Sequence, residues 1–590
     1  MHDGQQGEHT YMWRTLIKSI RDYKKPTILA PVFVALEVII ECTIPFITAL
    51  LVNQIKAGCT YDVVVRYGLI LIVLASMSLT LGWLSGRAAA TAASGFARNL
   101  RKDLFYNIQS FSFENIDRFS SSSLVTRLTT DVTNVQNAFM MLIRIAVRSP
   151  LMLIFAIIMS FLMGGKLALI FVVVIPMLGI GLFFIIRAAF PIFRRVFRKY
   201  DALNRSIQEN VQGIRVVKSF VRETYEKQKF GVAAEELRQE FTKAEKILAF
   251  NGPMMQFCLY INMVFILTFG AYTIATTGGL NFNVGQLSSL MIYSFQTLMS
   301  LMMLSMVFVM VTIADESSRR IVEVLSEDSS LKSPENAVQD VPDGSVDFDH
   351  VSFRYSEKAE RMALLDVDLH IRSGETIGIL GTTGSSKTSL VQLIPRLYDA
   401  TSGTVRVGGR DVKEYDLTAL RNQVSVVLQN NLLFSGTIAE NLRWGNPQAT
   451  DEELKQACEF AQADDFIRSF PQGYETRIEQ GGTNVSGGQK QRLSIARALL
   501  KKPRILILDD STSAVDTHTD AKIRAALKSY LPETTKIIIA QRVASVMDAD
   551  RIVMLDKGGI SSVGTHEELL KTDAAYREVY ESQSKAGEQE

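Results

Sequence analysis

Residues 381–388 read Gly-Thr-Thr-Gly-Ser-Ser-Lys-Thr, and this stretch decides the fold of the C-terminal half of the chain. It follows the apolar segment Thr376–Leu380 and precedes an apolar run with helical spacing. Glycine-rich loops between a strand and a helix cradle phosphates with backbone N–H groups and the helix N-terminus. The stretch therefore predicts a P-loop, in which Lys387 reaches the outer phosphates and the Thr388 hydroxyl holds Mg²⁺.

One position of this loop departs from the usual pattern. P-loops carry glycine immediately before the lysine, whereas this chain has Ser386. If the position needs a positive φ, a serine there costs about 1 kcal/mol. We expect weakened loop geometry and retained nucleotide binding.

A second phosphate-site element lies further along the chain. Residues 504–510 read Arg-Ile-Leu-Ile-Leu-Asp-Asp, a hydrophobic strand that ends in two carboxylates. A carboxylate in this place supports the Mg²⁺ of a P-loop site. Short apolar strands alternate with helices around both elements, which predicts an α/β P-loop nucleotide-binding domain over residues 345–590 with a mainly parallel sheet.

The N-terminal half is too apolar for a wholly soluble protein. No Asp, Glu, Lys or Arg occurs in the 68 residues between Lys246 and Asp315. A bilayer span needs about 20 mostly apolar residues. Six runs predict an α-helical six-span transmembrane domain: Thr27–Val52, Tyr67–Gly86, Arg144–Gly165, Leu167–Ile186, Ile247–Thr276 and Leu287–Ala314.

Basic residues flank these spans unevenly. Those on one side are Arg14, Lys18, Arg21, Lys24 and Lys25 before span one, and Arg194, Arg195, Arg198, Lys199, Arg205, Arg215 and Lys218 after span four. The loops on the other side are short and carry at most one lysine. Basic residues collect on the cytoplasmic side of short loops, so both termini and the nucleotide-binding domain are expected in the cytoplasm. The cytoplasmic connections are then the long ones, with helical limbs reaching nearly 40 Å from the bilayer.

These features divide the chain into four parts. Residues 1–26 form an N-terminal tail and an elbow helix, whose mixture of apolar and basic residues suits the membrane interface more than the cytosol. Residues 27–325 form the transmembrane domain with two long cytoplasmic loops. A polar linker over 326–344 leads to the nucleotide-binding domain at 345–590.

Composition excludes several other classes of protein. The net charge is +2, with 47% hydrophobic and 21% charged residues, so neither a disordered chain nor a nucleic-acid-binding polycation is indicated. Four cysteines lie scattered at Cys42, Cys59, Cys258 and Cys458. Their spacing predicts neither a disulfide framework nor a zinc site.

The segment Asn484-Val485-Ser486-Gly487-Gly488-Gln489-Lys490-Gln491-Arg492 lies between the P-loop and the carboxylate strand. With this segment the chain resembles the ATP-binding cassette (ABC) transporters, over nearly its whole length. Six spans followed by one nucleotide-binding domain resemble an exporter half-transporter, similar to bacterial multidrug exporters. The resemblance implies ATP hydrolysis coupled to transport, ATP and Mg²⁺ as cofactors, and a multi-pass location among the lipids of a bacterial cell membrane.

The resemblance also implies roles for individual residues. Tyr355 would stack on adenine, although an aromatic residue is common in any strand. The Ser486–Gln489 signature would cap ATP bound to the other subunit, and coupling helices near 124–132 and 209–220 would contact a nucleotide-binding domain. ATP contacts are implied for Tyr355, Gly381, Thr382, Thr383, Gly384, Ser385, Ser386, Lys387, Thr388, Ser389, Gln429, Ser486, Gly487, Gly488, Gln489 and Asp516, and Mg²⁺ contacts for Thr388, Gln429 and Asp509.

Two catalytic positions depart from the family pattern. Asp510 stands where active members have the glutamate that activates water, and it is one methylene shorter, a retraction of roughly 1.5 Å in a reaction sensitive to such displacement. Gln541 stands where the family usually has histidine, and an amide can donate a hydrogen bond but cannot carry a proton. The ATP site on this chain is therefore expected to be catalytically weak.

A weak site beside an intact signature suits a heterodimer, in which this chain completes the working site of a second half-transporter. A homodimer with slow turnover is the alternative. The expected cargo is a small amphipathic or drug-like compound, moved outward by nucleotide-gated alternating access. A homodimeric lipid or peptide flippase and an ATP-gated regulatory membrane protein are the other functions considered.

Two features of the spans bear on the transport pathway. Glu37 and Glu41 lie one turn apart in span one, where acidic residues are costly and often functional. They would line a cavity that accepts cationic compounds, pair with Arg144 or Arg148, or lie exposed near the outer surface. Methionines recur at helical spacing in span six, which suits either an adaptable cavity or an ordinary helix interface: Met299, Met302, Met303, Met306 and Met310.

Overall fold

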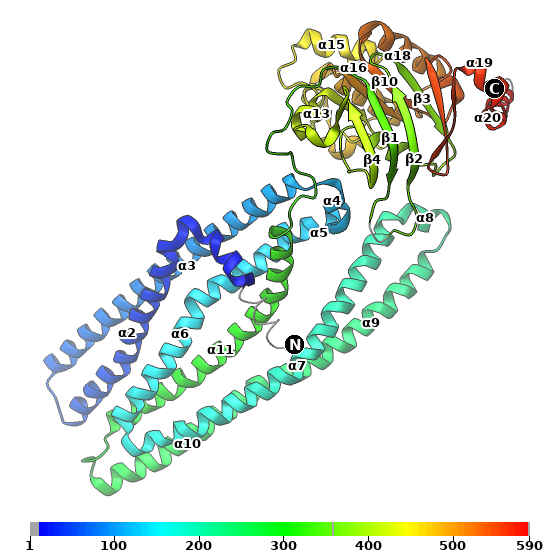
Figure 1. Cartoon of the computed structure of the whole chain (residues 1–590). Coiled ribbons are helices and arrows are strands. Elements are labelled where there is room, and N and C mark those ends of the chain that lie inside the picture. The colour runs from blue at the N-terminus through cyan, green and yellow to red at the C-terminus, as the bar shows by residue number, and fades with distance from the viewer. Residues whose placement is uncertain (1–10, 357–358, 588–590) are drawn as a thin grey trace. The chain divides into compact units, whose positions relative to one another are not determined.

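The structure is a computed structural model that describes residues 11–356 and 359–587 (Figure 1). It divides into two compact units. The first contains residues 1–109 and 121–327, and the second contains residues 110–120 and 328–590. The boundary after Glu327 falls inside the segment predicted as a linker, and a short excursion from the N-terminal half belongs to the second unit.

The described residues of the first unit form helices joined by short turns, with no strand among them. Among the described residues, five helical runs are long and apolar enough to cross a membrane. One of them, Ser121–Phe193, holds two predicted spans, and Gly165 with φ +51° breaks it between α6 and α7. Six predicted spans therefore lie in five continuous runs. The helices are η1 (Lys18–Tyr23), α2 (Lys24–Lys56), α3 (Tyr61–Ser110), α5 (Ser121–Thr126), η2 (Arg127–Asp131), α6 (Val132–Gly164), η3 (Gly165–Leu169), α7 (Ile170–Gln212), α8 (Ile214–Ser219), α9 (Glu223–Leu248), α10 (Asn251–Thr277) and α11 (Val284–Leu325).

Helices α2, α6 and α11 form one packed core of this unit. Backbone carbonyls of α2 beside Pro45 accept hydrogen bonds from α11: Tyr293 Oη donates to the Cys42 oxygen at 2.7 Å, and Ser289 Oγ donates to the Pro45 oxygen at 2.6 Å. Hydrocarbon offers polar groups no hydrogen bonds, so such contacts are satisfied inside the protein. They join α11 to α2 around Pro45, which lies inside the continuous helix α2.

The two glutamates of span one are paired with arginine. Arg148 on α6 donates to Glu37 Oε1 and to Glu41 Oε2, both at 2.6 Å. Glu37 is 7% exposed, so its carboxylate is largely removed from solvent and faces the Arg148 guanidinium inside the helix bundle. Arg144, the other candidate partner, lies beside Gly86 on α3. The ion-pair interpretation with Arg148 is confirmed within this chain.

The connection after span four is a long helical hairpin. α7 continues to Gln212, the short α8 follows, and α9 returns alongside α7 (Figure 1). Lys199 contacts Glu236 at 3.0 Å and Arg195 contacts Glu240 at 3.3 Å. These exposed pairs add little stability, but they place opposite charges on the facing surfaces of α7 and α9. The side chains of Arg194 and Arg198 lie outside the described residues.

The first coupling segment differs from the prediction. α4 (Phe113–Phe119) belongs to the nucleotide-binding unit, whereas residues 124–132 belong to the membrane unit. The latter segment is held there because Asp131, fully buried, pairs with Arg320 of α11. Within this chain the contact with the nucleotide-binding domain is therefore made by α4, several residues earlier than expected.

The second unit is an α/β domain, and the residues described in it form three sheets. A six-stranded sheet has the order β12-β11-β3-β10-β9-β6, a four-stranded antiparallel sheet has the order β2-β1-β4-β5, and β7 pairs with β8. Strand bounds are β1 (Val346–Phe353), β2 (Leu364–Ile371), β3 (Thr376–Gly381), β4 (Ser402–Val407), β5 (Arg410–Asp411), β6 (Val424–Val427), β7 (Gly436–Thr437), β8 (Arg477–Ile478), β9 (Ile505–Asp509), β10 (Thr535–Ile539), β11 (Arg551–Asp556) and β12 (Gly559–Gly564).

Helices complete this unit. They are α12 (Lys387–Gln392), η4 (Val412–Glu414), α13 (Leu417–Gln423), α14 (Ile438–Arg443), α15 (Asp451–Phe460), α16 (Asp464–Ser469), η5 (Gly473–Glu475), η6 (Gln480–Gly482), α17 (Gly487–Leu499), α18 (Thr517–Tyr530), η7 (Val543–Ser545), α19 (His566–Thr572) and α20 (Ala574–Gly587). Every residue of β9 and β10 is buried, as expected for central parallel strands covered on both faces. The predicted α/β domain is confirmed.

Candidate nucleotide site

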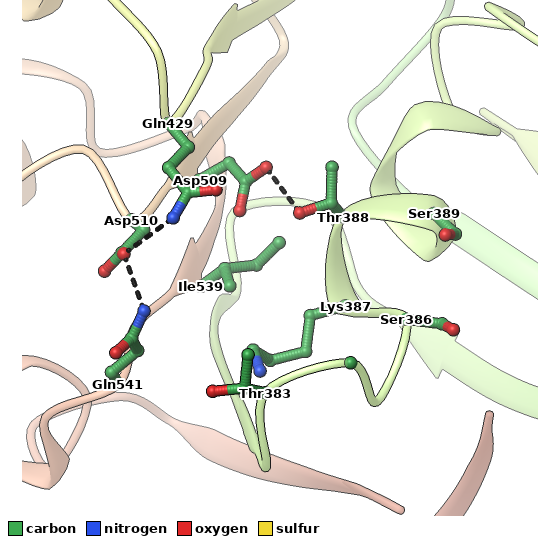
Figure 2. A pocket seen from close by; sticks show the side chains of 11 residues that line it. Thr383, Ser386, Lys387, Thr388, Ser389, Gln429, Asp509, Asp510, Ile539 and Gln541 are labelled. Atoms are coloured by element: carbon green, nitrogen blue, oxygen red, sulfur yellow. Dashed lines mark hydrogen bonds between the residues drawn. The ribbon is translucent and has the colours of Figure 1, made fainter. Parts of the chain in front are cut away.

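Four adjacent strand ends supply the candidate site. β3, β10, β9 and β6 run parallel side by side, so their carboxyl ends meet at one edge of the sheet. Ligands of open α/β sheets bind outside such edges. A pocket of about 290 Å³ opens there (Figure 2), lined by Thr383, Gly384, Ser386, Lys387, Thr388, Ser389, Gln429, Asp509, Asp510, Ile539 and Gln541.

The P-loop has the strained serine that the sequence suggested. Ser386 adopts φ +71° and ψ +26°, the left-handed region, and its side chain makes no capping bond to α12. Glycine occupies this region without a steric penalty. The backbone conformation of the loop is therefore kept despite the substitution, at a cost of about 1 kcal/mol.

Lys387 folds back over the loop. Its Nζ donates to the carbonyl oxygens of Gly381 at 2.8 Å and Thr382 at 3.0 Å. Burial lowers the pKa of Lys387, while the carboxylates of Asp510 and Asp509 act in the opposite direction. The ammonium lies among backbone acceptors and lines the pocket, and its contact with the outer phosphates stays a prediction.

The predicted Mg²⁺ ligands converge. Thr388 Oγ1 donates to Asp509 Oδ2 at 2.8 Å, and Gln429 lines the same pocket (Figure 2). Burial raises the pKa of Asp509, which the Thr388 hydroxyl partly offsets. Hydroxyl, carboxylate and amide oxygens are the donors that Mg²⁺ prefers, so these three residues fit the ion. Mg²⁺ held there would neutralise charge on the phosphate oxygens.

The two substituted positions contact each other. Gln541 Nε2 donates to Asp510 Oδ2 at 3.0 Å, and Gln429 Nε2 donates to the same oxygen at 3.3 Å (Figure 2). Asp510 thus lies between two side-chain amides. Each amide donates a hydrogen bond to the carboxylate, but neither can carry a proton away from it. The two hydrogen bonds orient the Asp510 carboxylate within the pocket.

Tyr355 lies beside the start of α12. Its hydroxyl is 2.7 Å from Ser389 Oγ, and its ring meets the ring of Tyr398 edge-on at 5.2 Å. Tyr355 as a whole residue is 44% exposed, so part of it is accessible to a ligand. Its adenine-binding role stays a prediction.

Several predicted residues lie away from this pocket. Ser486 caps α17 through a reciprocal pair with Gln489, and a Cβ on Gly488 would lie 2.8 Å from the Ala514 carbonyl oxygen. Asp516 caps α18 by accepting from Thr519 N–H at 2.9 Å. Gly487 lies in the same first turn of α17, and Gly381, Thr382 and Ser385 belong to the P-loop without lining the pocket. The structure therefore places the signature outside this chain's own site.

Sequence reasoning missed one pocket residue. Ile539 ends β10 and its side chain lines the pocket between Asp510 and Lys387 (Figure 2). The sequence feature that could have identified Ile539 is its place at the carboxyl end of a buried strand, two residues before Gln541.

A helical membrane domain joined to a P-loop domain with a signature helix defines an ATP-driven membrane transporter. Residues 27–310 match the family described as ABC transporter transmembrane region, and residues 364–513 match the family described as ABC transporter. The chain belongs to the ABC transporters, with the exporter arrangement of a membrane domain followed by an ATPase domain.

The chain is similar to several bacterial proteins. It is 39% identical to the uncharacterized ABC transporter ATP-binding protein YfiB of Bacillus subtilis, covering 88% of this chain and 89% of that protein. It is 31% identical to a putative multidrug export ATP-binding/permease protein of Staphylococcus aureus, covering 82% and 84%.

A solved structure supports the fold. A bacterial Atm1-family ABC exporter with ATP bound matches with a TM-score of 0.82 at 23% identity, covering 95% of this chain and 98% of that one. ATP and Mg²⁺ as ligands, ATP hydrolysis coupled to transport, and a multi-pass location in the membrane follow from membership of the family.

Proposed function

We propose that this chain is one subunit of a heterodimeric exporter of amphipathic, drug-like compounds, and that its own ATP site turns over slowly. The observation that carries the proposal is the Gln541–Asp510–Gln429 contact. The other carboxylate that lines the pocket, Asp509, is bonded to the Thr388 hydroxyl. The signature helix α17 is fully formed, so the chain can still complete a partner's site.

The first test removes the weak carboxylate. Asp510→Ala should keep more than about half of the ATPase activity of the assembled transporter, because most turnover belongs to the partner's site. Removing the glutamate at the corresponding position of the partner should nearly abolish activity. Purification of this chain with its associated subunit, followed by ATPase assays of both variants, makes the comparison. Equal losses would favour a homodimer or two equivalent sites.

A second test concerns the signature. Gly488→Asp is ambiguous, because any side chain at Gly488 meets the Ala514 carbonyl oxygen within this chain. Gln489→Glu is sharper: glutamate at this position of a capping box keeps α17 intact and adds a negative charge beside the partner-bound phosphates. We expect ATPase activity to fall about tenfold or more while melting temperature stays unchanged. Full activity in Gln489→Glu would contradict the shared site.

Two features support an amphipathic, drug-like compound as the proposed cargo. The relative from Staphylococcus aureus carries multidrug export in its name, and none of the six methionines on α11 is buried within this chain. Flexible, polarizable side chains that are not fully buried suit varied ligands. ATP-dependent accumulation of an amphipathic dye in inverted vesicles tests export, and ATP-dependent movement of labelled phospholipid alone would indicate a flippase.

A further inference from the structure

The C-terminal helix α20 contacts the loop that carries Gln541. Gln583 Nε2 donates to the Gln541 carbonyl oxygen at 2.9 Å, and Gln583 Oε1 accepts from the Val543 N–H at 2.8 Å. One side-chain amide thus bonds to two backbone groups of the loop. Glutamine suits this contact because it offers a donor and an acceptor together.

Two aromatic residues fix the position of Gln583. Tyr576, Tyr580 and Gln583 are spaced i, i+4 and i+7, so they share one face of α20. Tyr576 is fully buried, with its hydroxyl 2.6 Å from His566 Nδ1, and the Tyr580 ring meets the His566 ring edge-on at 5.1 Å. The helix is anchored through its first turns, and Gln583 is carried to the loop by the next turn.

The loop is held on both sides of Gln541. Ala540 N–H donates to the Ile379 carbonyl oxygen of β3 at 3.3 Å, and Val543 is buried in the domain core. The amide of Gln583 joins the backbone on either side of Arg542. Between these supports, the Gln541 side chain points to Asp510 in the pocket (Figure 2).

We propose that Gln583 is a positioning residue for ATP hydrolysis at this chain's own site. It acts through the Gln541 loop: the two backbone bonds keep the Gln541 amide on Asp510, and Asp510 stays oriented toward the phosphate end of the pocket. The C-terminal helix thereby sets the rate of the chemical step. The proposal holds for a homodimer and for a heterodimer, because every residue in it belongs to one chain.

The test reads hydrolysis on this chain alone. The full-length chain, assembled as purified from membranes, is loaded with 8-azido-[α-³²P]ATP and Mg²⁺ and cross-linked at intervals until conversion is complete. The ratio of ADP to ATP on this chain then gives the rate of its own site. For Gln583→Ala we expect a rate about threefold or more lower, with total labelling unchanged, because the P-loop and Tyr355 are untouched.

Two further variants test whether the rate depends on the Gln583 amide itself. Gln583→Glu keeps the acceptor for Val543 N–H and loses the donor, placing a carboxylate against the Gln541 carbonyl oxygen, so the rate should fall at least as far. Glu581→Ala is the matched control on an exposed position of the same helix, and it should leave the rate unchanged. An unchanged rate in Gln583→Ala, or equal losses in the control, would overturn the proposal.

A double-mutant comparison separates positioning from general stability. If Gln583 acts through the Gln541 side chain, Gln583→Ala should have no further effect on the rate in a Gln541→Ala background. The melting temperatures of Gln583→Ala and Glu581→Ala should match. The same loss of rate in both backgrounds, or a fall in melting temperature together with a fall in total labelling, would show that the helix merely stabilises the domain.

Discussion

At the scale of single residues, the backbone strain at Ser386 can be tested by substitution. Its φ of +71° favours glycine, so Ser386→Gly should stabilise the P-loop by about 0.5–1 kcal/mol and tighten ATP binding about two- to fivefold. Ser386→Ala is the matched control, because it removes the hydroxyl and keeps the Cβ. Titration with a fluorescent ATP analogue measures both. If the two variants bind equally, the hydroxyl and not the backbone is responsible.

At the scale of elements, α4 is joined to the nucleotide-binding domain through Tyr398. Its hydroxyl donates to Asp117 Oδ2 at 2.8 Å. The centroids of the Tyr398 and Phe113 rings are 6.1 Å apart, and the Tyr398 ring also meets the Tyr355 ring edge-on. Tyr398→Phe keeps the rings and loses a bond of about 1 kcal/mol. Hydrogen exchange of the α4 amides should then rise roughly fivefold in the full-length protein.

A control for this change lies in the same domain. Tyr415 is fully buried and donates to the Val407 carbonyl oxygen at 2.8 Å, without contact to α4. Tyr415→Phe should leave exchange in α4 unchanged. Equal exchange in α4 for wild type and Tyr398→Phe would show that ring contacts alone hold this coupling segment.

At the scale of the whole molecule, the Glu37–Arg148–Glu41 cluster ties α2 to α6. Glu37 is nearly fully buried and bonded to Arg148, so Glu37→Gln should lower stability by about 1–3 kcal/mol. Glu41→Gln, at a more exposed carboxylate, should cost less. The loss of the monodisperse gel-filtration peak on heating measures both. Unchanged stability with a selective loss of cationic-dye transport would instead place Glu37 in a substrate cavity.

Much of this protein is determined by its sequence alone. Apolar runs of bilayer length predict membrane helices because hydrocarbon leaves the backbone few alternatives. The P-loop, the carboxylate strand and the signature predict the ATPase domain because each needs its residue types at fixed local spacing, and the strain at Ser386 follows from a single missing glycine. These are local constraints, and a linear chain displays them directly.

Only the tertiary structure decided the partners of the long-range contacts. Arg148 rather than Arg144 pairs with Glu37, α4 rather than residues 124–132 contacts the nucleotide-binding domain, and Gln583 bonds to the Gln541 loop. Each contact joins segments far apart in the chain, and several candidates have equally suitable chemistry. The choice depends on which helix faces meet after the core has packed, and no short stretch of sequence records that.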